Sequence, residues 1–150
     1  MGQNATEYTT TSHIRAPLDT VWTVLTDAGR YGEWNPEIIG ISGRMALDER
    51  IKARVRLGSG AIRSVTMRVT AFERPLRLEW TGGLPLGLFV GKRTFTLSPR
   101  SDGTVEFRLH LRMSGPLASL ILKSVGDRQP EVDSFSTALR ARSEQIHSVV

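Results

Sequence analysis

The feature that most constrains the fold is a long stretch, residues 38–113, in which apolar and polar side chains alternate. In its segment 51–57, Ile51, Val55 and Leu57 alternate with charged residues. Neighbouring side chains of a β-strand point to opposite faces of the sheet, so each such segment has one apolar and one solvent-facing side. The pattern recurs in four later segments, at 65–69, 76–80, 89–97 and 105–113. It predicts an antiparallel sheet that is covered on one face only.

The connections between these segments carry turn signals. Gly58-Ser59-Gly60 and Asp102-Gly103 each separate two alternating segments, and glycine accepts the positive φ angles of tight hairpins. A further strand is predicted over Tyr8–Ile14, which is rich in β-branched residues. Together these segments predict a sheet of about seven strands.

Helical spacing is found on either side of this stretch. Two short helices are predicted after the first strand, the first with Pro17 in its first position, where a missing backbone N–H costs nothing. A long helical layer is predicted from Pro116 onward, with a break near residues 126–130 because Pro130 removes a backbone donor. Its apolar positions are three and four residues apart, at Val132, Phe135 and Leu139. The predicted fold class is α+β.

The composition excludes several kinds of site. The chain has 150 residues and no cysteine, which excludes a disulfide scaffold, thiol catalysis and a cysteine-ligated metal. Its three histidines are far apart in the sequence, so no metal and no cofactor is predicted. The sequence also lacks a glycine-rich phosphate loop and paired carboxylates. A chain of this length is predicted to form one domain, residues 1–150, that buries roughly 70% of the surface of the unfolded chain.

No targeting or membrane segment is recognised in the sequence. The first residues lack the basic and apolar regions of a signal peptide. The longest apolar stretch, Leu84–Val90, is far shorter than the ~20 residues of a membrane helix. A cytoplasmic protein without membrane insertion is therefore predicted.

The chain is basic, with a formal net charge of +5, which suits a polyanionic partner or an anionic membrane surface. Alternation places many arginines on the solvent-facing side of the strands, at positions 54, 56, 63, 68, 77, 108 and 112. No aromatic residues are interleaved with them, as they are on surfaces that bind single-stranded nucleic acids, so no nucleic-acid partner is expected. An interaction module that uses this basic face stays open as an alternative function.

Several motifs carry a resemblance to a known superfamily. The first two are Ile14-x-Ala16-Pro17-x-x-x-Val21-Trp22-x-x-x-Thr26-Asp27 and Tyr31-x-x-Trp34-Asn35-Pro36. Two later ones are Pro75-Leu76-x-Leu78-x-Trp80 and Gly91-x-x-x-Phe95-x-Leu97. They resemble the START/Bet v 1-like (SRPBCC) superfamily, in particular its polyketide cyclase/dehydrase and lipid transport branch. The resemblance implies a helix-grip fold, in which a curved antiparallel sheet wraps a long C-terminal helix and leaves an apolar cavity.

The inward faces of the strands define a candidate lining for that cavity. The lining positions are Ile51, Val55, Met67, Val69, Leu78, Trp80, Phe89, Phe95, Phe107, Leu109 and Leu111, with Phe135 and Leu139 from the helix. Members of the superfamily bind lipids, sterols, polyketides or hormones, so the resemblance implies a hydrophobic ligand. The other interpretation is that these side chains pack on one another as an ordinary core.

Candidate polar residues are few. Arg93 is in phase with Phe95, so alternation points it inward; it is expected to anchor an acidic ligand group, to reach solvent, or to pair with Glu33 or Glu37. The resemblance places the segment 31–36 beside the cavity mouth, where Trp34 would contact the ligand or plug the opening. Arg93, Tyr31 and Glu33 are the weak catalytic candidates. Asp27 is expected to cap the turn that follows it.

Three functions stay open on this basis. The first is the binding of an apolar or amphipathic small molecule in the cavity, and the second is a cyclase- or dehydratase-like reaction there, so the sequence leaves open whether the protein is an enzyme. The third is the interaction module on the basic face. The apolar segment Gly82–Leu88, expected as a loop, would serve as a lid over the ligand or as a contact with a second copy in a homodimer.

Overall fold

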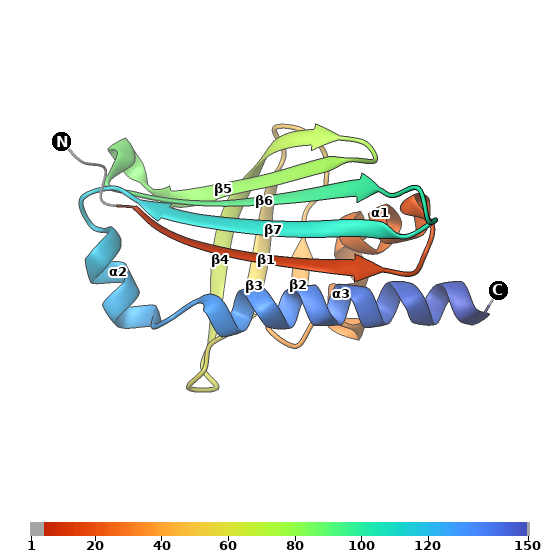
Figure 1. Ribbon diagram of the computed structural model, residues 1–150. Coiled ribbons are helices and arrows are strands. Elements are labelled where there is room, and N and C mark those ends of the chain that lie inside the picture. Colours follow the sequence, from red (N-terminus) through yellow and green to blue (C-terminus); the bar gives the residue numbers. More distant parts are fainter. Residues whose placement is uncertain (1–4, 150) are drawn as a thin grey trace.

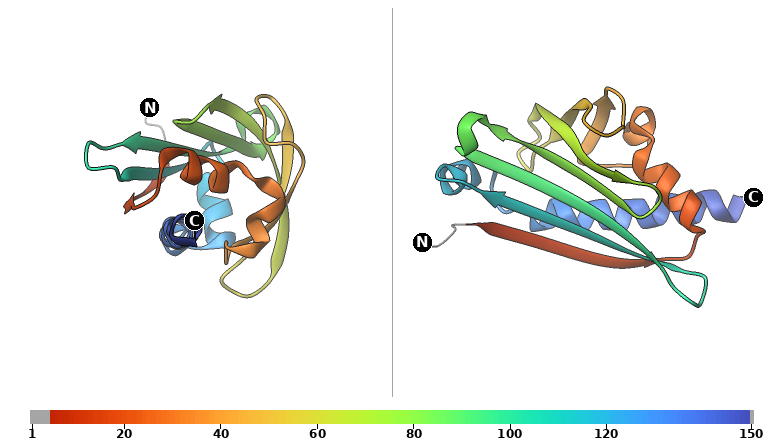
Figure 2. Two further views of the ribbon diagram at one scale, coloured as in Figure 1. Left: turned by 90° about the vertical axis from the view of Figure 1, so that its right-hand side faces the viewer. Right: turned by 90° about the horizontal axis from the view of Figure 1, so that it is seen from above.

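The computed structural model describes residues 5–149 of the chain. In these residues, seven antiparallel strands form one curved sheet, and a long C-terminal helix runs along its concave side (Figures 1 and 2). The elements in chain order are β1 (Thr6–Ile14), α1 (Leu18–Thr26), η1 (Ala28–Glu33), β2 (Ile38–Ser42), β3 (Arg50–Arg56), β4 (Ile62–Glu73), β5 (Arg77–Leu84), η2 (Pro85–Gly87), β6 (Phe89–Pro99), β7 (Val105–Ser114), α2 (Ala118–Val125) and α3 (Gln129–Val149). The predicted α+β class and helix-grip arrangement are confirmed.

The strand order of the sheet is β1-β7-β6-β5-β4-β3-β2. The first strand therefore pairs with the last one, from Thr6 opposite Met113 to Ile14 opposite Val105. Burial alternates along the strands as the sequence pattern predicts; in β3, for example, Ile51, Ala53 and Val55 are buried and their neighbours are exposed. The buried positions face the helical layer, and the solvent-facing positions form the convex side.

Two short helical segments follow β1, as predicted. In α1, Val21, Trp22 and Leu25 are buried, which matches the predicted apolar stripe. Pro17 is not the first helical residue, however: its ψ angle of 151° is extended, and the helix starts at Leu18. The carbonyl of Pro17 still accepts the first hydrogen bond of the helix, from the backbone N–H of Val21 at 3.1 Å.

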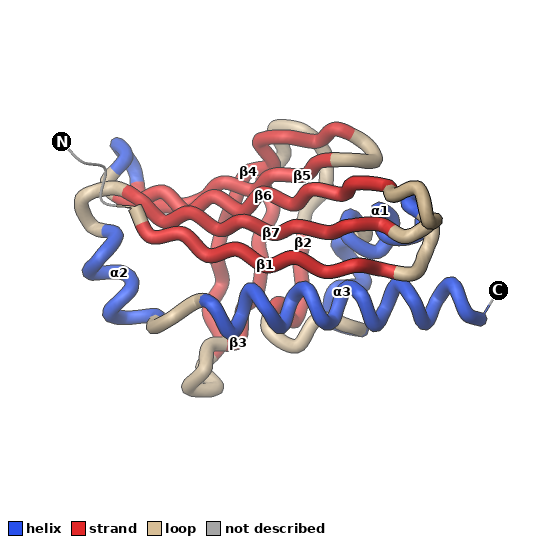
Figure 3. The backbone as a smooth tube through the Cα atoms, viewed as in Figure 1, coloured by secondary structure: helices blue, strands red, loops and turns tan. Residues whose placement is uncertain are grey.

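The C-terminal helical layer is broken where the sequence predicts a break. α2 ends at Val125, Gly126 follows with a φ angle of 81°, and α3 begins at Gln129. A positive φ angle is accessible to glycine and ends a helix efficiently. Beyond the break, α3 packs along β1 and beside α1 (Figure 3). The break sets where the first turn of α3 meets the sheet, and that turn holds part of the site described below.

Two details differ from the sequence prediction. The segment 82–88 is not a loop throughout, because β5 continues to Leu84 and pairs there with Phe89, and Pro85–Gly87 forms a 3-10 turn. Val65, expected on the apolar face, is 38% exposed, although Ala53, which lies opposite it on β3, is fully buried. No helix among residues 5–149 is long and apolar enough to span a membrane. Residues 1–4, on which the targeting prediction partly depends, lie outside the described residues.

Candidate functional site

The space between the sheet and α3 is filled by aromatic side chains. The ring centroids of Trp80 and Phe95 are 4.7 Å apart, those of Phe95 and Phe135 5.3 Å, and those of Phe107 and Phe135 6.1 Å. These separations are typical of favourable aromatic pairs, and all four side chains are buried. With Tyr31 and Trp34 they form one group, called the aromatic cluster below. The structure thus brings the predicted aromatic lining residues together, except Phe89.

The aliphatic lining positions are buried in the same interior. The buried ones are Ile51, Val55, Met67, Val69, Leu78, Leu109, Leu111 and Leu139. Phe89 is only half-buried and packs at the margin of the core. Apart from Phe89, the predicted lining residues of the sheet and of α3 therefore lie in the packed core.

Three ionic side chains form an interior ion cluster beside these rings. Arg93 lies on β6 opposite Trp80, and its Nη2 is 2.9 Å from Oε2 of Glu131 and donates to Oε1 at 3.1 Å. Arg128, just before α3, donates to the same Oε1 from Nη2 at 2.6 Å. The exposed fractions of the side chains of Arg93, Arg128 and Glu131 are 14%, 9% and 3%. Arg93 therefore points inward as predicted.

The expected pairing of Arg93 with Glu33 or Glu37 is wrong. Glu131 takes that place because the break before α3 positions the first turn of this helix beside β6. Sequence reasoning missed both Glu131 and Arg128. The only available signal was an acidic residue in the first turn of a predicted helix. Acidic residues are common at that position because they interact favourably with the helix dipole, so this signal does not indicate a partner for Arg93.

The interior ion cluster has unbalanced charge. Two guanidinium groups and one carboxylate leave a net charge of +1, and Nη1 of Arg93 is buried without a hydrogen-bond partner among the described residues. Burial disfavours the charged form of Glu131, but the charges and hydrogen bonds of Arg93 and Arg128 outweigh this and hold its pKa below the ordinary value of 4.5. Glu131 is therefore ionised at neutral pH, and the excess positive charge stays with the arginines.

Tyr31 is the second buried polar group at the aromatic cluster. Its hydroxyl donates to the carbonyl of Leu25 at 2.5 Å, at the end of α1. Burial raises its pKa well above 10.0, while the charge of Arg93 lowers it to a smaller extent. Tyr31 is therefore a neutral phenol, close enough to Arg93 for the two to interact electrostatically.

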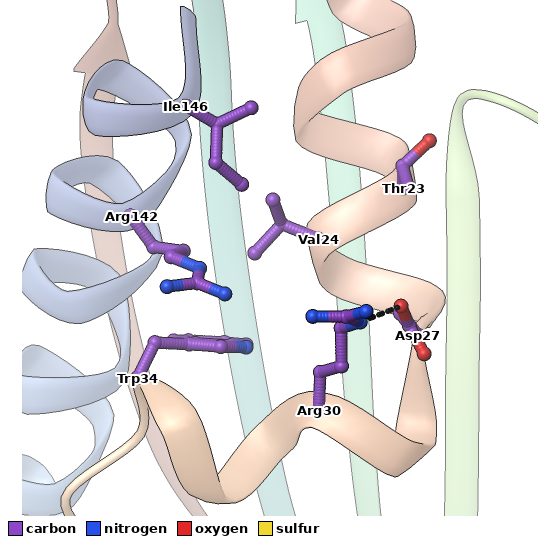
Figure 4. A pocket seen from close by; sticks show the side chains of 7 residues that line it. All are labelled: Thr23, Val24, Asp27, Arg30, Trp34, Arg142 and Ile146. Carbon is purple, nitrogen blue, oxygen red and sulfur yellow. Dashed lines mark ion pairs between the residues drawn. The ribbon is translucent and has the colours of Figure 1, made fainter. Parts of the chain in front are cut away.

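A small pocket lies on the other side of Trp34. Its volume is about 200 Å³, and it is lined by Thr23, Val24, Asp27, Arg30, Trp34, Arg142 and Ile146 (Figure 4). Trp34 is half-buried and its ring packs edge-on against Phe135, with centroids 5.6 Å apart. This indole therefore lies between the pocket and the fully buried rings of the aromatic cluster.

Ion pairs surround this pocket and form an outer ion cluster, which consists of Asp27, Arg30, Glu33 and Arg142. Arg142 of α3 donates to Glu33 at 2.6 Å, and Arg30 lies 3.4 Å from Glu33 and 3.5 Å from Asp27. Asp27 makes no side-chain capping hydrogen bond, so the predicted cap is wrong; its carboxylate contacts Arg30 instead, three residues along the turn. The structure does not unite the three catalytic candidates, since Glu33 belongs to this outer cluster while Arg93 and Tyr31 lie inside.

Comparison with known proteins gives matches in sequence and in structure. Residues 5–144 match the family model described as polyketide cyclase / dehydrase and lipid transport. A START superfamily protein from Mycobacterium smegmatis superposes with a TM-score of 0.74 at 17% identity, covering 97% of this chain and 99% of that one. The Zhui aromatase/cyclase from Streptomyces sp. R1128 gives 0.75 at 15% identity, with 95% of each chain covered. Norcoclaurine synthase from Thalictrum flavum gives 0.73 at 11% identity, with 97% and 98% covered. No curated protein matches the sequence.

Proposed function

We propose a function from the premise that this chain belongs to the polyketide cyclase / dehydrase and lipid transport family, with the helix-grip fold of the START/Bet v 1 superfamily. The protein binds an amphipathic small molecule, with an apolar or aromatic body and one acidic group, between the sheet and α3. The observation that carries this proposal is the net positive interior ion cluster, placed directly beside the aromatic cluster.

The excess positive charge of the interior ion cluster is the reason why the proposed ligand carries an acidic group. Burying an ion is costly unless it is paired, and here one guanidinium is in excess. The first turn of α3 adds the partial positive charge of a helix N-terminus. A carboxylate or enolate at Nη1 of Arg93 would balance this charge and accept a charge-assisted hydrogen bond. An apolar ligand without such a group would leave the imbalance in place.

The route into the interior passes Trp34. A pocket of about 200 Å³ is smaller than the roughly 300–1,000 Å³ of sites that enclose drug-sized ligands. A ligand that enters through this pocket would therefore have to displace the Trp34 indole, which packs against Phe135. In this proposal the ligand contacts Trp34 and Arg93 together with the buried lining residues named above, and Phe89 at the margin.

A panel of lipophilic compounds tests this proposal. Fatty acids, sterols, quinones and aromatic polyketides are screened for an increase in melting temperature. At about 100 times its Kd, one ligand stabilises the fold by roughly 2.7 kcal/mol, or about 5 °C or more at this chain length. Trp34→Ala should speed the association of a compound that binds, whereas Leu47→Ala, a change at an exposed leucine between β2 and β3, should leave the rate unchanged. A panel without any stabilising compound would contradict the proposal.

A cyclase- or dehydratase-like reaction in the same interior is the second candidate. The observation that favours it is the buried phenol of Tyr31 near Arg93. A substrate group that replaces the carbonyl of Leu25 as the acceptor of this phenol would find a proton donor and a cation beside the aromatic cluster. Turnover of a poly-β-keto thioester should then be lost in Tyr31→Phe and Arg93→Ala and retained in Glu33→Gln. Turnover that survives both interior changes would remove those residues from the mechanism.

A further inference from the structure

Four exposed leucines gather at one end of the molecule. Leu84, Leu86 and Leu88, in and around η2, are 42%, 98% and 41% exposed, and Leu120 of α2 is 61% exposed. The backbone N–H of Leu117 donates to the carbonyl of Leu88 at 2.9 Å, which joins the turn to the start of α2. Both elements lie at the left-hand end of Figure 1. These four residues are called the leucine tip.

The backbone of the tip holds Leu86 out in an unfavourable conformation. Its φ and ψ angles are 62° and 25°, a left-handed region that glycine or asparagine enters easily and that costs a leucine free energy. A side chain that is 98% exposed gains nothing from burial to offset this. Single exposed leucines are ordinary on protein surfaces, but a cluster of them marks a surface that meets another apolar phase.

A row of cations crosses the convex face of the sheet near this tip. Its members occupy one register line, in which Arg50, Arg68, Thr81, Lys92 and Arg112 face one another across β3 to β7. None of these four basic side chains has a described carboxylate within 4.0 Å. Like charges on directly opposite residues are destabilising, so this basic row would be relieved by an anionic surface.

The basic row and the leucine tip belong to one end of the sheet. Thr81 precedes Leu84 by three residues on β5, and Arg68 and Lys92 of the basic row lie directly opposite Thr81 on the neighbouring strands. Three residues of strand span about 10 Å. Cations at this distance from an apolar protrusion match the depth of a bilayer interface, where phosphates lie outside the apolar boundary.

We propose that this end of the protein docks on the surface of an anionic lipid bilayer, with the leucine tip entering the interface and the basic row facing lipid phosphates. A nucleic acid would satisfy the cations but offers no apolar phase to the leucines. A symmetric contact with a second copy would cover the leucines but would bring two basic rows together. The docking surface does not depend on the proposed small-molecule site.

Vesicle flotation tests the contribution of the leucines. Wild-type protein should bind vesicles of phosphatidylcholine mixed with phosphatidylglycerol, bind phosphatidylcholine alone weakly, and lose binding as salt is added. The double variant Leu86→Asp, Leu120→Asp should weaken binding by about tenfold or more, because the apolar contact is lost. Leu86→Gly relieves the backbone strain, so it should fold at least as well as wild type and still bind less. Leu76→Asp, at a leucine that is 45% exposed just before β5 and so at the end of that strand opposite the leucine tip, is the matched control.

The same assay tests the cations. Arg68→Gln and Lys92→Gln should each reduce binding to the anionic vesicles about fivefold. Arg108→Gln is an equal charge change on the convex face, but Arg108 lies four residues from Arg112 on β7 and outside the basic row. This change should have a smaller effect. No vesicle binding by wild type, or binding that survives the leucine changes, would overturn the proposal. A dimer that the leucine changes dissociate, or leucine-independent binding to duplex DNA, would assign the surface to those partners instead.

Discussion

The two ends of α3 hold the same kinds of ionic groups in opposite environments. At its start, the interior ion cluster consists of Arg93, Arg128 and Glu131, whose side chains are 3–14% exposed and whose charges sum to +1. Toward its other end, two arginines and two carboxylates form the outer ion cluster, with exposures of 22–64% and a sum of zero. The interior cluster contacts the aromatic core, and the outer one surrounds a small open pocket.

The difference shows that the contribution of an ion pair to stability and to ligand binding depends on how buried the pair is. Exposed pairs contribute about 0–1 kcal/mol because water and salt screen them. Buried charges must be compensated, so the loss of one partner is expensive and an excess charge favours an oppositely charged ligand. The interior cluster should therefore govern both stability and ligand choice, while the outer cluster should affect neither strongly. The following predictions test this contrast.

The largest effect is expected for Glu131→Gln. This change leaves the guanidinium groups of Arg93 and Arg128 buried without a counter-charge, which should reduce the free energy of unfolding by about 3 kcal/mol. Urea denaturation measures the loss, and Asp133→Asn, an exposed carboxylate on the same turn of α3, serves as the control. A Glu131→Gln protein within about 1 kcal/mol of wild type would show that the cluster is not effectively buried.

A pH series sharpens the same point. The pKa of Glu131 in the folded protein lies below 4.5, so its ionised form contributes stability that is fully present above that ordinary value. This contribution is lost as the pH falls through the folded pKa. The difference in unfolding free energy between wild type and Glu131→Gln should thus be constant near neutral pH and shrink below pH 4.5. A difference that grows on acidification would contradict the assigned charge state.

The smallest effect is expected at the outer cluster. Glu33→Gln removes the partner of Arg142 at 2.6 Å, yet Glu33 is 47% exposed, and the loss should be below about 1 kcal/mol. The ion pair should also weaken with added salt. Parallel urea titrations at low and high salt measure both effects. A loss as large as that of Glu131→Gln would remove the distinction between the two clusters.

The sheet and the inward direction of Arg93 could be predicted because both follow from a period of two. The motif resemblance then supplied the helix-grip arrangement, which the structure confirms. The partner of Arg93 could not be predicted, since it depends on where the break at residues 126–128 places Glu131 in space. The sequence could not show whether the inward aromatic rings leave a cavity or touch one another. Phe95 and Phe135 occupy the same positions of the apolar pattern in both cases.

The apolar segment Gly82–Leu88 shows another limit of prediction from sequence. Its apolar character was evident, and a lid or a subunit contact was the expected role. Its extended backbone up to Leu84 and the left-handed angles of Leu86 depend on hairpin geometry, and the apolar pattern carries no information on this. Only Arg68 and Arg112 of the basic row belong to the arginines that alternation places on the solvent-facing side; the strand register aligns them with Arg50 and Lys92.

The most direct test of the central claim compares an acid with its neutral analogue. Calorimetric titration of 2-naphthoic acid and of 2-naphthamide keeps the aromatic body constant and changes only the charge. Wild type should bind the acid at least about tenfold more tightly, as expected for a charge-assisted hydrogen bond in the interior. Arg93→Gln should lose this preference and keep its affinity for the amide, with folding checked by thermal melting. Equal binding of the two compounds to wild type, or an acid preference that persists in Arg93→Gln, would contradict the role assigned to the interior ion cluster.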